Sequence, residues 1–221
     1  MDVAIIDYKM SNLHSVQSAC NSVGLQSVIT SDQNQILDAK VAILPGVGAF
    51  GEAMSHLTEL KLDDCIYRFI DTGKPFIGIC LGFQLLFEKS EEFGAQAGLN
   101  ILKGSVKRFQ FYVDNNTKYT VPQVGWNRIF QNGNSWENTL LCDNCDGEFM
   151  YFVHSYYVVP EDENISLTTT TYGKVKYCSS INYKNIFATQ FHPEKSGELG
   201  IKIYHEIKKI VKKNEKTRNI L

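Results

Sequence analysis

Cys80 lies in a segment whose residue types and spacing suit nucleophilic chemistry. The segment Gly78-Ile79-Cys80-Leu81-Gly82 has the form Gly-x-nucleophile-x-Gly and separates an apolar run from an amphipathic one. Glycines on both sides of a nucleophile permit a tight strand-to-helix turn, and the start of a helix favours a thiolate through its dipole and its free N–H groups. The pattern indicates a nucleophile elbow, although taken alone it is also compatible with a buried structural cysteine.

His192 and Glu194 supply the other groups that a nucleophilic cysteine needs, in the segment Gln190-Phe191-His192-Pro193-Glu194. In an extended chain, two side chains that are two residues apart point to the same side. A histidine can take the thiol proton and return it to a leaving amine, while a carboxylate fixes the tautomer of the histidine. By itself the segment could be a surface turn. Both segments follow apolar runs that could be strands, and open α/β sheets form their sites just beyond the carboxyl ends of the strands. We therefore predict a Cys80–His192–Glu194 triad.

A glycine-rich segment, Pro45-Gly46-Val47-Gly48-Ala49-Phe50-Gly51, follows a third apolar run. Its glycines allow backbone N–H groups to face an anion. A phosphate-binding loop is the alternative, but the segment lacks the Lys-Ser/Thr pair that ends a Walker motif. We therefore predict an oxyanion hole made by Gly46, Val47 and Gly48 together with the N–H of Leu81.

The elements around these segments alternate between strand and helix in the first half of the chain. Short apolar runs predict strands at residues 3–7, 26–30, 41–44 and 76–79. Helical spacing predicts helices at residues 12–23, 62–70 and 83–88. This order predicts an α/β fold with an open, mostly parallel sheet and helices on both faces, as in flavodoxin-like proteins.

The second half of the chain has a different sequence pattern. Short β-rich segments separated by polar turns occupy residues 105–111, 118–121, 127–130, 150–159, 167–172, 176–183 and 186–190. We expect them to extend the sheet with mixed or antiparallel strands, and we expect a last helix at residues 197–213. No linker or repeat interrupts the chain, so residues 1–221 are predicted to form a single domain.

Composition narrows the classes of protein that the chain can belong to. The net charge of −2 and the 21% of charged residues give no strong field for a nucleic acid or a membrane surface. No window reaches the roughly 18 apolar residues of a membrane span, and the N-terminus lacks the features of a signal peptide. With six cysteines and no secretory signal, reduced thiols in the cytoplasm are expected.

The pair Cys142-Asp143-Asn144-Cys145 has spacing like that of a metal site. A zinc site needs four ligands, and neither a second pair nor a nearby histidine completes this one. The adjacent acidic side chains also disfavour thiolates. We predict no metal here.

Together, the glycine-rich loop, the elbow and the His-Pro-Glu segment resemble the class I glutamine amidotransferases. Six segments, three of which overlap those just named, follow in order along nearly the whole chain and are similar to the glutaminase subunits of imidazole glycerol phosphate synthases. They span residues 7–13, 45–50, 80–87, 121–127, 151–157 and 190–196.

The resemblance implies a reaction and its residues. In such enzymes a thiolate attacks the side-chain amide of glutamine, ammonia leaves, and water hydrolyses the γ-glutamyl thioester. Cys80 would be the nucleophile, His192 the general base and acid, and Glu194 the orienting carboxylate. Residues that match the glutamine pocket are Gln84, Glu92, His154, Ser155 and Tyr156. Such a pocket needs an acid for the ammonium of the substrate and neutral donors for its carboxylate. No cofactor is implied.

The resemblance also implies a partner. The family pairs this subunit with a (β/α)8-barrel cyclase, which uses the ammonia in histidine biosynthesis. Positions that match the interface are Gln123, Trp126, Asn127 and Lys195. An exposed tryptophan suits an interface anchor, although a core position for Trp126 fits the sequence equally well.

The chain departs from the family pattern at three positions. Lys9 and Ser11 replace usual glycines, and Gln123 replaces a usual histidine. Partner identity is thereby left open, and a relative that supplies ammonia for bacterial surface sugars is the alternative. Two other classes of protein are alternatives: a cysteine hydrolase acting on peptides or γ-glutamyl conjugates, and a non-catalytic binding module. A complete triad argues against the binding module.

Overall fold

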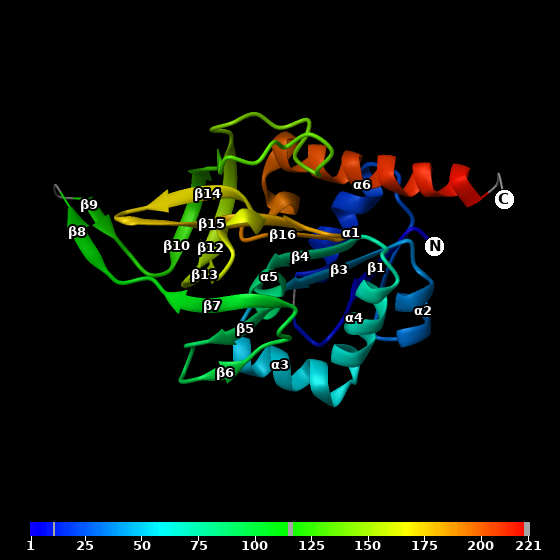
Figure 1. Cartoon of the computed structure of the whole chain (residues 1–221), viewed down its shortest axis with the longest axis horizontal. Coiled ribbons are helices and arrows are strands. Elements are labelled where there is room, and N and C mark those ends of the chain that lie inside the picture. Colours follow the sequence, from blue (N-terminus) through cyan, green and yellow to red (C-terminus); the bar gives the residue numbers. More distant parts are fainter. Residues whose placement is uncertain (11, 115–116, 219–221) are drawn as a thin grey trace.

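A twelve-stranded sheet runs through the middle of the molecule (Figure 1), in a computed structural model that describes residues 1–10, 12–114 and 117–218. Five parallel strands form one half of it, and their spatial order is β2 (Ser27–Thr30), β1 (Val3–Ile6), β3 (Val41–Gly46), β4 (Phe76–Cys80) and β16 (Ile186–Thr189). The carboxyl ends of β3, β4 and β16 therefore lie side by side.

Helices cover both faces of the parallel half. One face carries α1 (Leu13–Ser22) and α6 (Gly197–Arg218), and the other carries α2 (Gln33–Asp38), α3 (Phe50–Glu59) and α4 (Leu62–Asp71), as Figure 1 shows. Strand β1 is buried along its length because its side chains alternate between the two layers. Val3 and Ile5 pack into the core under α1, while Ala4 and Ile6 pack into the opposite core. The predicted α/β class, with helices on both faces, is confirmed.

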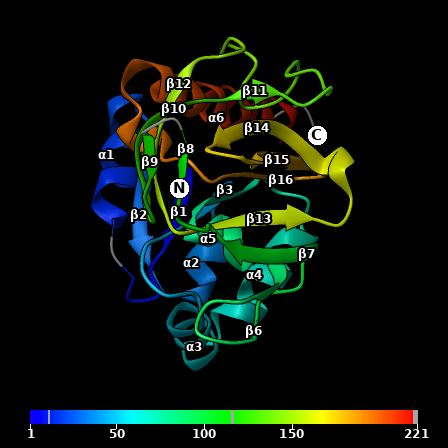
Figure 2. The ribbon, with the colours of Figure 1, turned by 90° about the vertical axis from the view of Figure 1, so that its left-hand side faces the viewer.

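The other half of the sheet is mostly antiparallel, as predicted. Its strands are β5 (Phe87–Ser90), β6 (Gln96–Ala97), β7 (Leu102–Arg108), β11 (Phe130–Gln131), β13 (Tyr156–Pro160), β14 (Ser166–Tyr172) and β15 (Val175–Tyr183). Two separate ribbons project from this half, one made of β10 (Gln123–Arg128) and β12 (Phe149–His154) and one of β8 (Tyr112–Asp114) and β9 (Thr117–Tyr119) (Figures 1 and 2). Among the described residues, no helix is long and apolar enough to cross a membrane.

The predicted helix at residues 83–88 is wrong in its bounds. The helix, α5, covers Leu81–Leu85 and begins directly after Cys80, and the chain then enters β5. The apolar run Leu85-Leu86-Phe87 fits either element in isolation. Pairing of β5 with β7 and β6 decides its conformation, and that pairing depends on residues distant in sequence.

Two helices, α2 and α3, were missing from the sequence prediction. Helix α2 is polar and buries only Ile36, and its start is marked by Asp32, whose side chain accepts hydrogen bonds from the N–H groups of Asn34 and Gln35. Helix α3 buries Phe50, Ala53 and Leu57, which follow helical spacing.

The predicted strand at residues 150–159 is two strands. The strand is interrupted at Ser155. Before it, β12 pairs with β10, and after it, β13 pairs with β7 and β15. Aromatic and β-branched residues on both sides of His154-Ser155 favoured one continuous strand, but the interruption brings residues 154–156 to the carboxyl end of the parallel strands.

Candidate active site

Cys80 ends β4 and directly precedes α5. Its backbone has φ 56° and ψ −106°, a conformation that non-glycine residues seldom adopt and that is concentrated at functional sites. Neighbouring glycines allow the close approach of other backbone segments: a Cβ on Gly82 would lie 1.8 Å from the Leu44 carbonyl oxygen, and one on Gly78 would lie 3.1 Å from the Gly82 carbonyl oxygen. The tight strand-to-helix turn predicted from the glycine spacing is present.

His192 and Glu194 follow β16, the strand next to β4. His192 Nδ1 lies 2.7 Å from Glu194 Oε1, and neither side chain is accessible to solvent. The same carboxylate oxygen accepts a hydrogen bond from Asn12 Nδ2 at 2.6 Å. The His192–Glu194 contact was predicted on the assumption of an extended chain, but Glu194 instead lies in a short 3-10 turn, η2 (Pro193–Lys195). Asn12, from the loop after β1, was not predicted as a site residue.

Charges around His192 determine its protonation. Burial by itself lowers the pKa of His192, but the Cys80 sulfur and the Glu194 carboxylate together raise it to about 10. The resulting imidazolium favours negative charge on the nearby sulfur. The Cys80 thiol donates to the Val153 carbonyl at 3.8 Å, and His192 Nε2 has no hydrogen-bond partner among the described residues. A turn of the Cys80 side chain would bring the sulfur to Nε2, whose N–H can then donate to it, and such loosened catalytic contacts are common without substrate.

The glycine-rich loop meets the elbow at the end of β3, where Gly46 pairs with Cys80. Tyr8 lies beneath the loop and donates a hydrogen bond from its hydroxyl to the Pro45 carbonyl at 2.8 Å. A Cβ on Gly46 would lie 1.9 Å from that hydroxyl oxygen. Glycine is therefore required where the loop, Tyr8 and the nucleophile come together.

A cavity of about 260 Å³ opens beside the nucleophile. Its lining contains three of the predicted oxyanion residues and all five predicted glutamine-binding residues: Val47, Gly48, Leu81, Gln84, Glu92, His154, Ser155 and Tyr156. Pro122 and Val153 also line the cavity; both lie in segments that match the family, but neither was predicted as a site residue. A small cavity with a few convergent polar groups suits a ligand the size of an amino acid.

Glu92 and His154 contribute to this cavity in different ways. Glu92 Oε2 accepts a hydrogen bond from the Phe50 N–H at 2.6 Å, which holds the carboxylate at the cavity. His154 Nδ1 lies 2.8 Å from the Tyr156 carbonyl oxygen, and its Nε2 lies 3.3 Å from the Tyr177 hydroxyl. Burial lowers the pKa of His154 to about 4. The neutral ring therefore shapes the segment 154–156 instead of offering a charge to a ligand.

The prediction that the Gln123 side chain lies at the partner interface is wrong. Its side chain is buried and lies 3.1 Å from the Tyr177 hydroxyl, so it cannot meet a partner. Trp126 is 55% exposed, which excludes the core alternative. Lys195 is exposed, and Asn127 is half-buried with its Nδ2 donating to the Thr171 carbonyl. Of the two remaining departures, Lys9 is exposed and Ser11 lies outside the described residues.

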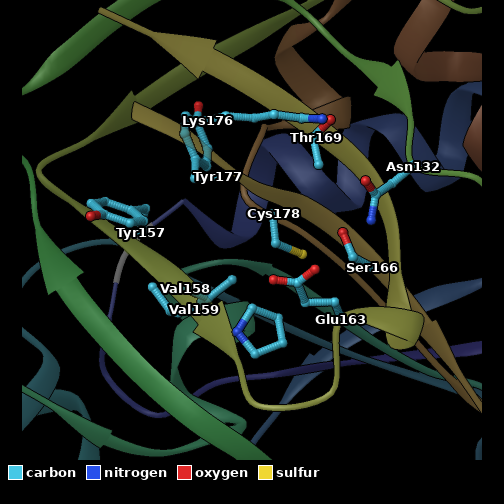
Figure 3. Close-up of a pocket in the computed structure, with 11 residues that line it drawn as sticks. Asn132, Tyr157, Val158, Val159, Glu163, Ser166, Thr169, Lys176, Tyr177 and Cys178 are labelled. Carbon is cyan, nitrogen blue, oxygen red and sulfur yellow. The ribbon is translucent and has the colours of Figure 1, made fainter. Parts of the chain in front are cut away.

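A second cavity, of about 210 Å³, lies between β13, β14 and β15 and includes no triad residue (Figure 3). Cys178 lines it, but the thiol donates to the Ser180 carbonyl at 3.3 Å. Burial raises the pKa of the Cys178 thiol to about 12, so it stays protonated. Cys178 is therefore not a second nucleophile.

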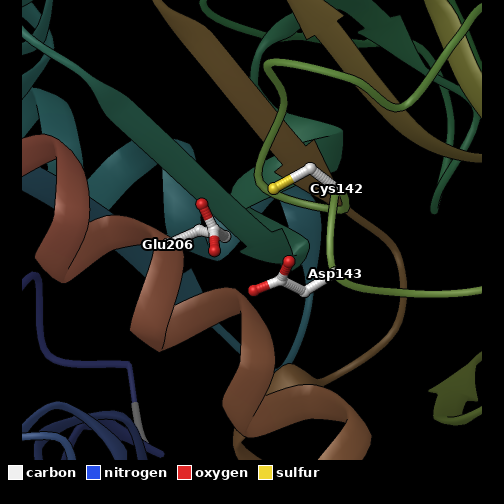
Figure 4. Close-up of side chains that lie close together, drawn as sticks. All are labelled: Cys142, Asp143 and Glu206. Atoms are coloured by element: carbon white, nitrogen blue, oxygen red, sulfur yellow. The ribbon is translucent and has the colours of Figure 1, made fainter.

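Cys142, Asp143 and Glu206 bring three potential metal-ligand atoms within 4.8 Å of one another (Figure 4). Lys209 already forms ion pairs with both carboxylates, with Nζ 2.9 Å from Asp143 Oδ2 and in contact with Glu206 Oε1. Burial and the neighbouring Glu206 raise the pKa of the Cys142 thiol to about 11. Cys145 does not join the cluster. The donor set does not fit a metal centre.

Comparisons with known proteins agree with this geometry. The class-I glutamine amidotransferase family model matches residues 4–207. The imidazole glycerol phosphate synthase subunit HisH of Aquifex aeolicus is 47% identical over 96% of this chain and 99% of the relative, and that of Bacillus subtilis is 41% identical over 94% and 96%. A crystal structure of a glutamine amidotransferase superposes with a TM-score of 0.70 at 13% identity, covering 96% of this chain and 99% of the other. The glutaminase domain of Trypanosoma brucei CTPS has a TM-score of 0.66 at 12% identity, covering 96% and 94%. The chain belongs to the class-I glutamine amidotransferases and, within them, to the family of HisH subunits.

Proposed function

We propose that the chain is the glutaminase subunit of an imidazole glycerol phosphate synthase, hydrolysing glutamine and supplying the ammonia to a (β/α)8-barrel cyclase. The observation that carries the proposal is that Cys80 and the glycine-rich loop line one small cavity, while the His192–Glu194 pair follows the strand next to that of Cys80. The HisH relatives support the histidine pathway. Nothing among them supports the surface-sugar alternative. Six free cysteines suit the reducing cytoplasm, where we place the reaction.

Substrate binding follows from the few polar side chains that line the cavity. The Glu92 carboxylate, fixed by the Phe50 N–H, would accept the ammonium of glutamine. Ser155 and Tyr156 would hold the α-carboxylate, and Gln84 would add a neutral contact. The side-chain amide would then reach Cys80.

The chemistry requires two proton transfers. The Cys80 thiolate attacks the amide carbon, and backbone N–H groups of the 46–48 loop and of Leu81 stabilise the oxyanion. His192, an imidazolium beside the sulfur, gives its proton to the leaving nitrogen and forms ammonia. His192 then removes a proton from water, which attacks the thioester and releases glutamate and the thiolate. Glu194 keeps the imidazole oriented throughout.

Partner control is the second part of the proposal. Gly46 and Gly48 flank the peptide of Val47, and Gly48 has φ 110°, so this peptide can turn at little steric cost. We propose that docking of the cyclase turns it and completes the oxyanion hole. Restoring one oxyanion donor changes the rate by about 10²–10³-fold.

The test is to measure glutamate release by the chain alone, with the cyclase, and with the cyclase plus its ligand. We expect weak activity alone and full activity only in the liganded complex. Full activity of the isolated chain would contradict partner control and favour a stand-alone hydrolase. In a Cys80→Ala complex we expect glutamine-dependent synthesis to vanish and ammonia-dependent synthesis to persist, because only the first needs the thioester. Glutaminase activity in that variant would overturn the assignment of Cys80.

A further inference from the structure

Gln190 lies at the end of β16 with a fully buried side chain, and it touches the nucleophile. Its Nε2 lies 3.6 Å from Cys80 Sγ, and its Oε1 lies 3.0 Å from Gln84 Nε2. The backbone N–H of Gln190 donates to the Ser179 carbonyl at 2.9 Å, which anchors the residue to β15. One amide therefore connects the sulfur to a side chain that lines the substrate cavity.

The orientations of both amides are fixed by one backbone carbonyl. Gln84 Nε2 lies 2.9 Å from the Tyr156 carbonyl oxygen, which can only accept a hydrogen bond. Gln84 must therefore direct its NH2 group toward Tyr156, and the same group then faces Gln190. Because the Gln84 NH2 group is a donor, Gln190 must present its oxygen to Gln84. The NH2 group of Gln190 is therefore left to face the sulfur. These contacts together direct the Gln190 N–H group toward Cys80 Sγ.

We propose that Gln190 is a further residue of the catalytic site, donating an N–H to the Cys80 thiolate while directing the Gln84 oxygen into the glutamine cavity. The proposal rests on the glutaminase function proposed above. An N–H donor stabilises a thiolate more than a thiol, because the acceptor is then charged. The carbonyl of Val153 accepts from the thiol and has the opposite preference. Gln190 therefore complements the imidazolium of His192.

The second role concerns the substrate. With its NH2 group committed to Tyr156 and Gln190, Gln84 has its Oε1 left for the cavity that it lines. That oxygen can accept an N–H from glutamine, such as its ammonium. Loss of the Gln190 oxygen would free the Gln84 amide to rotate and weaken substrate binding.

Two substitutions separate the two roles. Gln190→Met keeps the volume and removes both hydrogen bonds. Gln190→Glu keeps an acceptor for Gln84 but replaces the N–H at Sγ with a carboxyl oxygen. A carboxyl group ionises at lower pH than a thiol, so the added charge disfavours the Cys80 thiolate. Gln131→Met, at an exposed position of β11, is the matched control.

The first measurement is the rate at which iodoacetamide alkylates Cys80 in the full chain at pH 7, read from the Cys80 peptide by mass spectrometry. Both Gln190 variants should react about tenfold more slowly, the effect of losing a hydrogen bond to a charged group, and the control should match the parent. Burial raises the pKa of Cys20 and Cys178 to about 12, so their peptides should stay unlabelled in folded protein. Thermal unfolding of each variant verifies the fold.

The second measurement is the glutamine KM of the complex with the cyclase. Gln190→Met should raise it severalfold, whereas Gln190→Glu should leave it near the parental value. Alkylation within twofold of the parent in both folded variants would overturn the proposal, as would parental alkylation in Gln190→Glu alone. Because alkylation needs neither glutamine nor the cyclase, this result is independent of whether the proposed function holds.

Discussion

Replacing Glu194 with glutamine removes one negative charge from the site while retaining nearly every contact. Glu194 Oε1 accepts hydrogen bonds from His192 Nδ1 and Asn12 Nδ2, and a glutamine Oε1 can accept both. The new Nε2 would take the position of Oε2, which has no hydrogen-bond partner among the described residues. The tautomer and orientation of His192 are therefore kept, and the charge alone is lost.

The size of the effect follows from this geometry. A hydrogen bond to a charged group contributes about 1.5–3 kcal/mol and a neutral one about 0.5–1.5 kcal/mol. The difference of about 1–1.5 kcal/mol corresponds to about tenfold, so we expect glutaminase kcat to fall about tenfold in Glu194→Gln. His192→Asn loses the proton carrier and should fall about 10²–10⁴-fold. Burial lowers the pKa of His192 while Cys80 and Glu194 raise it. Without the Glu194 charge, the alkaline limb of the pH–rate profile should move to lower pH.

The assay follows glutamate formation by the complex with the cyclase and its ligand, coupled to a dehydrogenase. Glu198→Gln makes the same substitution at an exposed carboxylate on α6 and should leave kcat unchanged. A larger loss in Glu194→Gln than in His192→Asn would refute the assignment of the proton carrier to His192 and of orientation to Glu194.

Other consequences concern stability and the partner. Gly82→Ala places a Cβ 1.8 Å from the Leu44 carbonyl oxygen and should lower the free energy of unfolding, measured in urea, by about 3 kcal/mol. Gly73→Ala meets open space at φ 74° and should cost only about 1 kcal/mol; equal costs would contradict the packing argument. Burial lowers the pKa of His154 to about 4, so between pH 6.5 and 4 the unfolded chain binds the extra proton. Stability should fall by about 3 kcal/mol as pH drops through that window, and a His154→Gln variant that keeps the full decline would exclude this source. Trp126→Ala should weaken cyclase binding by about 2 kcal/mol and change unfolding by less than 1 kcal/mol, since Trp126 is 55% exposed; unchanged affinity would remove it from the interface.

Local sequence signals predicted the parts of the site that depend on local geometry. Glycines on either side of Cys80 mark a turn that other residues cannot make, and the signal holds because Leu44 approaches so closely. The His192–Glu194 contact spans two residues, so it too could be predicted, although by an incorrect backbone conformation. Where the residues are close in sequence and the turn has strict steric requirements, tertiary contacts have little influence on the local structure.

Contacts between distant segments could not be predicted in this way. Gln84 and Gln190 are 106 positions apart, and their hydrogen bond exists because β4 and β16 pair in parallel register. Gln123 was assigned to the interface from the family resemblance, but alternation in β10 turns it inward while Trp126 points outward. Face assignments in a ribbon depend on register, and register is set by the partner strand.

Strand β12 connects the ribbon surface to the triad, which bears on the partner control proposed above. On its outer side, Tyr151 faces Trp126 across the ribbon, with ring centroids 6.0 Å apart. On its inner side, the Tyr151 carbonyl accepts the His192 N–H at 2.9 Å, and the Val153 carbonyl accepts from the Cys80 thiol. Strand β12 thus contacts the exposed Trp126 of β10 through the half-buried Tyr151, and its backbone holds two triad residues. A partner that shifts the ribbon must shift these carbonyls, so docking can change the nucleophile without any contact inside the cavity.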